Sequence, residues 1–168
     1  MATPTDEVSI LREHLERYRG VTLQTVDLVP DDKLGWRPAE QSMSFAEQVL
    51  HIARVEEFYA SGIFGGVWRF ELFQELSGPL SKEGLKKKLG EGRAYLLAQL
   101  DALEAERLDE ILKVPNVPVD WPLRGWLWYL LEHELHHKAQ LAVYLRQLGV
   151  VPPFFALAFP PGVRPDIR

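Results

Sequence analysis

The histidines of this chain are the residues whose type and spacing can support chemistry. His133 and His137 lie four positions apart within the run His133-Glu134-Leu135-His136-His137. Positions four apart on an α-helix lie about 40° apart around its axis, so both imidazoles would face the same side. Neutral imidazole is a common zinc ligand, and three protein ligands with one open position are typical of catalytic metal sites. His51 is the candidate third ligand, because it lies in an apolar segment that is expected to be helical.

Each part of this cluster has an alternative interpretation. A lone histidine on an apolar helix face, such as His51, is often a hydrogen-bonded core residue rather than a ligand. The run that begins at His133 also matches the H-E-x-x-H pattern of zincin-type metalloproteases, in which Glu134 would be the general base. A zincin domain usually offers a sheet edge to its peptide substrate, and this sequence shows no convincing strand. The protease is therefore the less favoured alternative.

Other polar residues near these histidines have simpler explanations. His14 is expected at the edge of the first helix face. His136 lies about 100° around the helix from His137 and is expected to be exposed or to support the ligands. Three carboxylates are further candidates for supporting the ligands, but we expect solvated helix charges and assign them no catalytic role. These carboxylates belong to Glu56, Glu57 and Glu134.

The composition is that of a folded protein without a nucleic-acid-binding face. The chain has 168 residues, of which 46% are hydrophobic and 26% charged, so we expect a single domain over residues 1–168 with one core. The net charge is −5 and the basic residues are scattered apart from Lys86-Lys87-Lys88, which argues against a nucleic acid partner. The chain contains no cysteine, so a metal must be bound through nitrogen and oxygen atoms.

The sequence also lacks the patterns of a secretion signal or a membrane anchor. Its first residues include neither a basic nor a long apolar stretch, and nowhere do about 18 apolar residues follow one another. We therefore expect a soluble, cytoplasmic protein that has no membrane partner.

Hydrophobic periodicity and end signals predict four helices, hence an all-α protein built as a four-helix bundle. Ser44 and Glu47 match a capping box at the start of the second helix. Residues 62–80 fit a short helix or an ordered loop, and the Pro-rich tail 150–168 is expected to lie against the bundle through Phe154-Phe155. The expected helices run from Val8 to about Val29, from Ser44 to about Gly62, from Ser81 to about Leu108, and from the N-cap Asp120, with Pro122 in the first turn, to Gly149.

Four segments together resemble the DinB/YfiT-like superfamily of metal-dependent four-helix-bundle enzymes, and the resemblance spans nearly the whole chain. They are the loop Pro30-Asp31-Asp32-Lys33-Leu34-Gly35-Trp36-Arg37-Pro38, the helix that starts at Ser44 and carries His51, the run His133-Glu134-Leu135-His136-His137-Lys138-Ala139-Gln140-Leu141, and Gly149-Val150-Val151-Pro152-Pro153. Such proteins usually carry H-x-x-H-H-R-G-Q in the third segment, so Lys138 and Ala139 are departures, whereas the ligand positions match.

This resemblance implies a left-handed bundle with up-down-down-up topology, often a homodimer, and a three-histidine metal site formed by His51, His133 and His137. The superfamily includes S-transferases and isomerases that use low-molecular-weight thiols. We expect a divalent metal, zinc or nickel, to bind the three imidazoles and to lower the pKa of a coordinated thiol or water.

The leading hypothesis is therefore a metal-dependent enzyme, either a thiol-dependent S-transferase or a hydrolase, that acts on a small electrophilic molecule. The alternative from a different class is a metal-binding or stress-related bundle protein without turnover. The zincin-type metalloprotease is the third and least favoured hypothesis.

Overall fold

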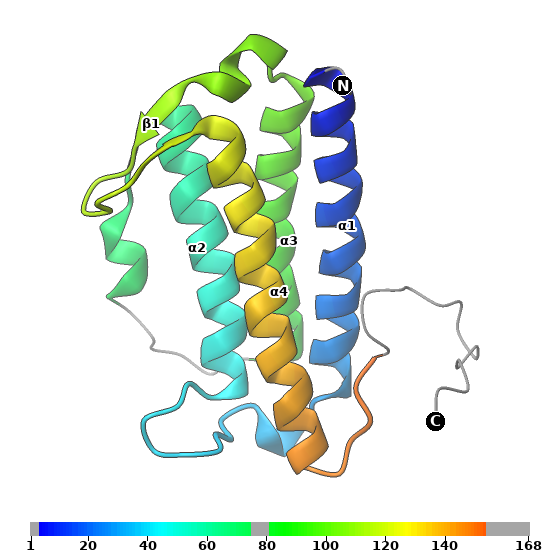
Figure 1. Cartoon of the computed structure of the whole chain (residues 1–168). Coiled ribbons are helices and arrows are strands. Elements are labelled where there is room, and N and C mark those ends of the chain that lie inside the picture. The colour runs from blue at the N-terminus through cyan, green and yellow to red at the C-terminus, as the bar shows by residue number, and fades with distance from the viewer. Residues whose placement is uncertain (1–3, 75–80, 154–168) are drawn as a thin grey trace.

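The computed structural model describes residues 4–74 and 81–153, and this part of the chain is mostly helical (Figure 1). It contains four long helices, three short 3₁₀ helices and a small two-stranded sheet. The long helices are α1 (Pro4–Leu28), α2 (Phe45–Gly65), α3 (Lys82–Asp101) and α4 (Leu123–Gln147). The short elements are η1 (Asp31–Lys33), η2 (Phe70–Phe73), η3 (Ala105–Asp109), β1 (Ile111–Lys113) and β2 (Asp120–Pro122). None of the helices in these residues has both the length and the apolar character that crossing a bilayer requires.

The four long helices lie side by side, with α1 and α4 running in one direction and α2 and α3 in the other (Figure 1). Helix α2 packs against α3 and α4, and α1 packs against the same two helices. Each long helix therefore has two helical neighbours, and the apolar faces of all four meet in the interior. Two clusters of buried side chains fill this interior, one around Trp126 and Leu96 and the other around Phe45 and Leu141. Because α2 contacts α4 directly, residues on these two helices can share one site.

The structure confirms some of the predicted helix ends and corrects others. Ser44 caps α2 through the predicted capping box with Glu47, whose side chain accepts the Ser44 N–H at 2.6 Å. Helix α3 ends at Asp101 rather than near Leu108, but η3 returns Leu108 to the core, where it is 1% exposed. The periodic leucine pattern thus marked a buried position correctly while placing it in the wrong element. Of the expected tail 150–168, residues 150–153 are non-helical, and Phe154-Phe155 lie outside the described residues.

The predicted start of the fourth helix and the expected absence of strands are wrong. Asp120 is not an N-cap, because residues Asp120–Pro122 form β2, which pairs antiparallel with β1. Pro122 is the N-cap of α4, and its side chain makes no capping hydrogen bond. The Leu123 N–H instead donates to the Glu110 carbonyl at 2.8 Å. Pairing with the nearby strand β1 therefore satisfies backbone groups that local sequence signals had assigned to a helix start.

The turn after α2 places η2 beside the helix that carries His51. Gly66 ends α2 in a left-handed conformation, with φ of 69°, that a residue without a side chain adopts at no steric cost. The chain then folds back so that the Trp68 ring lies against Gly62, at a separation that leaves no room for a Cβ atom. Trp68 and Phe73 both pack on Phe58, with ring centroids 5.2 Å and 5.3 Å away. Gly62 is thus a contact point that positions η2.

We predict that Gly62→Ala lowers the free energy of unfolding by about 1–3 kcal/mol, because its methyl group would overlap the Trp68 ring and force local repacking. Gly90→Ala is the matched control, since Gly90 is an exposed position within α3 and no atom lies within 4 Å of a Cβ there. That control should raise the same free energy by roughly 0.4–1 kcal/mol. Urea denaturation of both variants measures the difference, and equal stabilities would contradict the contact.

Candidate metal centre

The three histidines selected from the sequence come together in the structure. His51 belongs to α2, and His133 and His137 belong to α4. One ring nitrogen from each residue lies within 4.8 Å of the others, and this is the grouping of metal-binding side chains found in the described residues. The Nε2 atoms of His51 and His133 are 3.1 Å apart, and the three ring centroids are 4.6–4.9 Å from one another. We call these residues the histidine triad.

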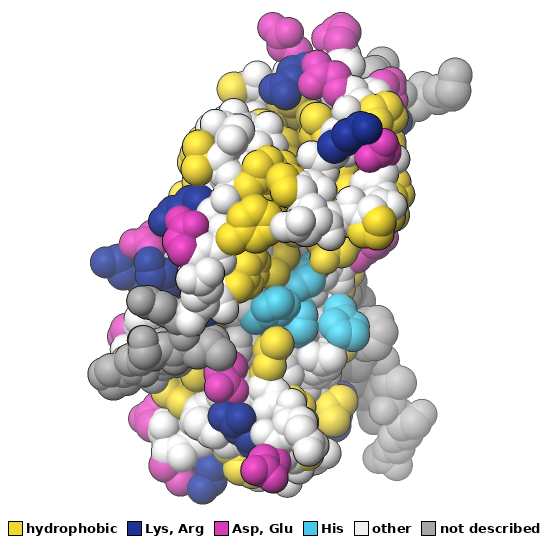
Figure 2. All heavy atoms as spheres, turned by 90° about the vertical axis from the view of Figure 1, so that its left-hand side faces the viewer, with side chains coloured by type: hydrophobic (Ala, Val, Ile, Leu, Met, Phe, Trp, Pro, Cys, Tyr) yellow, Lys and Arg dark blue, Asp and Glu magenta, His cyan; other side chains and the backbone are white. Residues whose placement is uncertain are grey.

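The geometry of the triad fits a divalent metal. Two nitrogen ligands about 2.0–2.1 Å from a tetrahedral zinc ion lie roughly 3.3 Å apart, close to the observed separation of His51 and His133. An imidazole–imidazole hydrogen bond would also account for that pair, but it would not explain why the His137 ring converges on the same point. The triad lies near the surface, where histidine side chains gather in the middle of one face beside a patch of hydrophobic side chains (Figure 2). A small ligand can therefore reach it from solvent.

Two glutamines orient His137 toward the centre of the triad. Its Nδ1 atom lies 3.2 Å from Oε1 of Gln48 and 3.1 Å from Oε1 of Gln140. Amide oxygens accept hydrogen bonds, so Nδ1 carries the proton and Nε2 keeps the lone pair that a metal requires. The Nε2 group of Gln140 lies 2.9 Å from Nε2 of His136, which is exposed. His136 is thus linked to the triad through Gln140, consistent with the expectation of an exposed or supporting residue.

Burial keeps the triad in its neutral form. Burial, together with the neighbouring imidazoles, lowers the pKa of His133 to about 3 and that of His137 to about 4. Burial also lowers the pKa of His51, with a smaller contribution from the positive charge of Arg54. Neutral imidazole is the form that binds metals, so no proton has to be displaced from the triad at pH 7.

Two carboxylates near the triad belong to a buried set of ion pairs, contrary to expectation. Glu134 is 1% exposed and Glu56 is 3% exposed, so neither is a solvated helix charge. Both pair with Arg19 and Arg93, which are also buried. Each of the four long helices contributes one member: Arg19 from α1, Glu56 from α2, Arg93 from α3 and Glu134 from α4. We call this group the charge quartet.

Both oxygens of Glu134 accept hydrogen bonds inside the quartet. Oε1 lies 2.9 Å from Nε of Arg19 and 2.7 Å from the Thr22 hydroxyl, and Oε2 lies 2.6 Å from Nη2 of Arg93. Burial alone would raise the pKa of Glu134, but the two guanidinium groups outweigh it and hold this pKa below its usual value. Glu134 is therefore ionised and fully engaged in the interior. This arrangement argues against its service as the general base of a protease.

The remaining candidates lie where the sequence suggested. Glu57 is partly exposed and pairs with Arg69, so its interpretation as a helix surface charge holds. His14 lies on α1 beside Tyr18 and Trp128, away from the triad. The sequence patterns did not predict the supporting residues Arg19, Arg93, Gln48 and Gln140. Of these, Gln140 was within reach, because the family pattern H-x-x-H-H-R-G-Q includes it.

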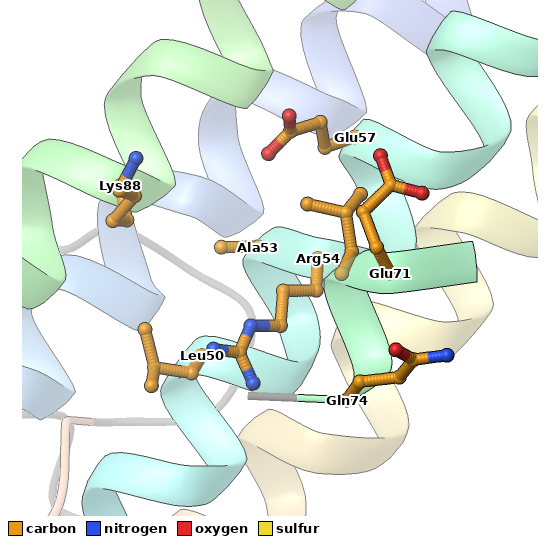
Figure 3. A pocket seen from close by; sticks show the side chains of 8 residues that line it. Leu50, Ala53, Arg54, Glu57, Glu71, Gln74 and Lys88 are labelled. Carbon is orange, nitrogen blue, oxygen red and sulfur yellow. The ribbon is translucent and has the colours of Figure 1, made fainter. Parts of the chain in front are cut away.

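Two pockets lie along α2, and the smaller one adjoins the triad at His51. The smaller has a volume of about 140 Å³ and is lined by Met43, Glu47, His51, Arg54 and Phe73. The larger, of about 360 Å³, lies between α2, η2 and α3 and has side chains of both charge signs around it (Figure 3). Its described lining residues are Leu50, Ala53, Arg54, Glu57, Glu71, Leu72, Gln74 and Lys88. Arg54 is shared by both pockets, whereas only the smaller one is lined by a member of the triad.

Comparison with known proteins identifies the family. The model of the DinB superfamily matches residues 14–141. The chain belongs to the DinB superfamily. The matched range contains the triad, the charge quartet, Gln48 and Gln140, so the site described above lies within the family's own fold. The resemblance inferred from the four sequence segments is thereby confirmed.

Relatives of known structure share the fold over most of the chain. The uncharacterized protein YjoA of Bacillus subtilis (strain 168) is 31% identical over 137 residues, which cover 81% of this chain and 87% of YjoA. The crystal structure of YjoA, described as a DinB-like protein, superposes with a TM-score of 0.70 at 28% identity, covering 89% of this chain and 99% of that one. A DinB-like protein from Bacillus cereus ATCC 10987 gives a TM-score of 0.73 at 18% identity, covering 86% and 95%, and shows the fold alone.

We predict that Glu134→Gln lowers the free energy of unfolding by about 3–5 kcal/mol, because it removes one negative charge and leaves two buried guanidinium groups undercompensated. Thr22→Val removes one hydrogen bond to Glu134 and should cost about 1–3 kcal/mol. Arg107→Gln is the control, because its pair with Glu110 is exposed and should contribute less than about 1 kcal/mol. Urea denaturation followed by tryptophan fluorescence ranks the three variants, and a loss at Glu134 no larger than the control would contradict the quartet's role.

We also predict that the metal-free protein loses stability as the pH falls from 6.5 to 5. The folded-state pKa values of His133 and His137 lie near 3 and 4, so the unfolded chain binds more protons throughout this window. The free energy of unfolding therefore rises with pH until the unfolded-state histidines are neutral, above about pH 6.5. Urea denaturation at several pH values measures the slope. His133→Gln should reduce it, and an unchanged slope in that variant would contradict the buried neutral imidazole.

Proposed function

We propose that this member of the DinB superfamily binds one divalent metal ion, zinc or nickel, through His51, His133 and His137. We further propose a thiol-dependent S-transferase or hydrolase that acts on a small electrophilic molecule, built as one DinB-type four-helix bundle over residues 1–168. The observation that carries the proposal is the convergence of three neutral imidazoles from two helices at a solvent-accessible point. A cytoplasmic homodimer with no nucleic acid or membrane partner completes the proposal.

The triad and two glutamines have different roles at this site. The triad holds the metal with three neutral nitrogen ligands, and Gln48 and Gln140 keep the His137 ring in the tautomer and orientation that binding requires. When bound, a divalent cation supplies positive charge that lowers the pKa of a coordinated thiol or water toward neutrality.

Apolar side chains close to the triad favour a substrate with an apolar body. The Tyr129 ring centroid lies 5.9 Å from that of His133, and Phe73 lines the pocket beside His51. A hydrophobic patch adjoins the histidines on the same face (Figure 2). Such surfaces exclude water from one side of a bound molecule and leave its polar, reactive end toward the triad.

The two alternatives differ from this proposal in what they require. A zincin-type protease needs Glu134 to reach a water molecule at the metal, whereas Glu134 is buried and bound to Arg19 and Arg93. A metal-binding protein without turnover needs only the triad. Metal content alone therefore does not distinguish this non-catalytic protein from the proposed enzyme. Activity measurements are needed to separate the two.

We predict that protein purified without a histidine tag contains about one equivalent of zinc or nickel, and that His51→Ala, His133→Ala and His137→Ala each lose most of it. Removing one of three protein ligands leaves too few to retain the ion through purification. His14→Ala is the matched control, because that residue lies away from the triad and should keep the full metal content. Elemental analysis measures the metal, and full metal content in all three triad variants would overturn the site.

Turnover is tested with the electrophile monochlorobimane and glutathione, bacillithiol or mycothiol. A transferase gives a conjugation rate that disappears on chelation and returns when the metal is restored. Absence of a metal-dependent rate with every thiol would favour the binding protein. Cleavage of casein that depends on Glu134 would instead favour the protease.

A further inference from the structure

We propose that His136 is a positioning residue for His137 and acts on it through Gln140, in a chain of hydrogen bonds that runs from buried Gln48 to the exposed His136 ring. The chain holds His137 in the tautomer whose Nε2 lone pair is available to a metal ion. This inference rests on the proposed metal site and gives a role to His136, which is not a member of the triad.

The chain begins at Gln48, which belongs to α2 and is 2% exposed. Its Oε1 atom lies 3.2 Å from Nδ1 of His137, which belongs to α4. An amide oxygen only accepts hydrogen bonds, so this contact requires the proton of the neutral His137 ring to be on Nδ1. Because the two residues come from different helices, the packing of α2 against α4 sets this end of the chain.

The proton on Nδ1 of His137 in turn determines how the Gln140 amide is oriented. Oε1 of Gln140 lies 3.1 Å from the same Nδ1 atom, so two amide oxygens share a single N–H. If the Gln140 amide were turned over, its NH₂ group would face that N–H and two donors would meet. The oxygen of Gln140 therefore faces His137, and its NH₂ group is directed away from that ring.

His136 binds the NH₂ group of Gln140 at the other end of the amide. Nε2 of His136 lies 2.9 Å from Nε2 of Gln140, and the amide nitrogen only donates, so the histidine nitrogen accepts. The two residues are four apart on α4, a spacing at which helix side chains meet. Gln140 is partly exposed, and without this contact its side chain could adopt rotamers that leave His137. His136 thus restrains the rotamer that Gln140 needs.

The same contact explains why His136 is not a fourth ligand. Its ring centroid lies 5.1 Å from that of His137, close enough to suggest a direct role at the metal. The lone pair on its Nε2 atom, however, accepts the Gln140 N–H, and its other ring nitrogen carries the proton of the neutral ring. The grouping of metal-binding side chains found in the described residues accordingly contains His51, His133 and His137 without His136.

The first test measures the tautomers of the metal-free protein. At about pH 8, above the ordinary histidine pKa, the ¹⁵N chemical shifts of the two ring nitrogens show which one carries the proton. We expect the proton on Nδ1 in both His136 and His137. In Gln140→Leu, His136 should show a mixture of both tautomers. A wild-type His136 ring that carries its proton on Nε2 would overturn the chain.

The second test measures zinc affinity by competition with a chromophoric chelator. Removing the partner of a metal-binding histidine typically weakens binding by 10–100-fold, so Gln140→Leu should weaken it by about ten-fold, because Gln48 still accepts from His137. His136→Ala should weaken binding by roughly three-fold or more, and should have no further effect in Gln140→Leu. Gln140→Glu keeps an acceptor for His137 but offers no donor to His136, so His136→Ala should also have no effect in that background.

His14→Ala is the matched control, because His14 lies on α1 and its Nδ1 atom pairs with Arg17. Unchanged zinc affinity in His136→Ala would overturn the chain. A loss that persists in Gln140→Leu would also overturn it, because His136 would then act without Gln140. Thermal unfolding is measured for each variant, and Gln140→Glu carries the test if Gln140→Leu does not fold. If the wild-type protein binds no zinc, the proposed metal site fails, whereas the tautomers of the metal-free protein still decide whether the chain exists.

Discussion

Two arginines and two glutamates, one from each long helix, meet in the interior and determine how the helices fit together. Arg93 Nη2 lies 2.6 Å from an oxygen of both Glu56 and Glu134, and Arg19 also pairs with both carboxylates. Rotating or sliding one helix would leave a buried charge without its partner, at a cost of several kcal/mol. The apolar clusters constrain the positions of the helices less strictly, because leucine contacts tolerate small shifts. The quartet therefore selects one register of the four helices.

This register places the three histidines of the candidate metal site. Glu134 directly follows His133 on α4, and Glu56 lies five residues after His51 on α2. Fixing the two glutamates against the same arginines therefore fixes the relative height and rotation of α2 and α4, which bring the triad together. Gly92 in α3 lies beside this group, where a Cβ atom would come to 3.4 Å from Oε1 of Glu56, at the edge of ordinary contact. The buried charges thus position the three histidines and do not themselves take part in chemistry at the site.

The sequence predicted the pair His133 and His137 because its geometry is local, whereas the family resemblance supported His51, 82 residues from His133, as the third ligand. The spacing of His133 and His137 places both on one helix face, and the capping box at Ser44 locates His51 within α2. The quartet escaped prediction because its contacts are distant in sequence: Arg19 and Glu134 are 115 residues apart. A glutamate beside a histidine gives no local sign that two arginines from other helices will bury it. The start of α4 was missed for a different reason, because Asp120 and Pro122 carry local signals of a helix start but belong to β2, which pairs with the nearby strand β1.

Adjacent residues on α4 face different surroundings. This explains why the H-E-x-x-H pattern wrongly suggests a protease. Successive helix positions differ by about 100°, so His133 faces α2 near the surface while Glu134 faces the interior. The triad supplies only neutral ligands, and the two nearby carboxylates of the quartet are already neutralised by arginine. A divalent cation held there would keep its full charge, whereas a carboxylate ligand would offset part of it. Segregating the carboxylates into the core would therefore strengthen the effect of the proposed cation on the pKa of a bound thiol or water.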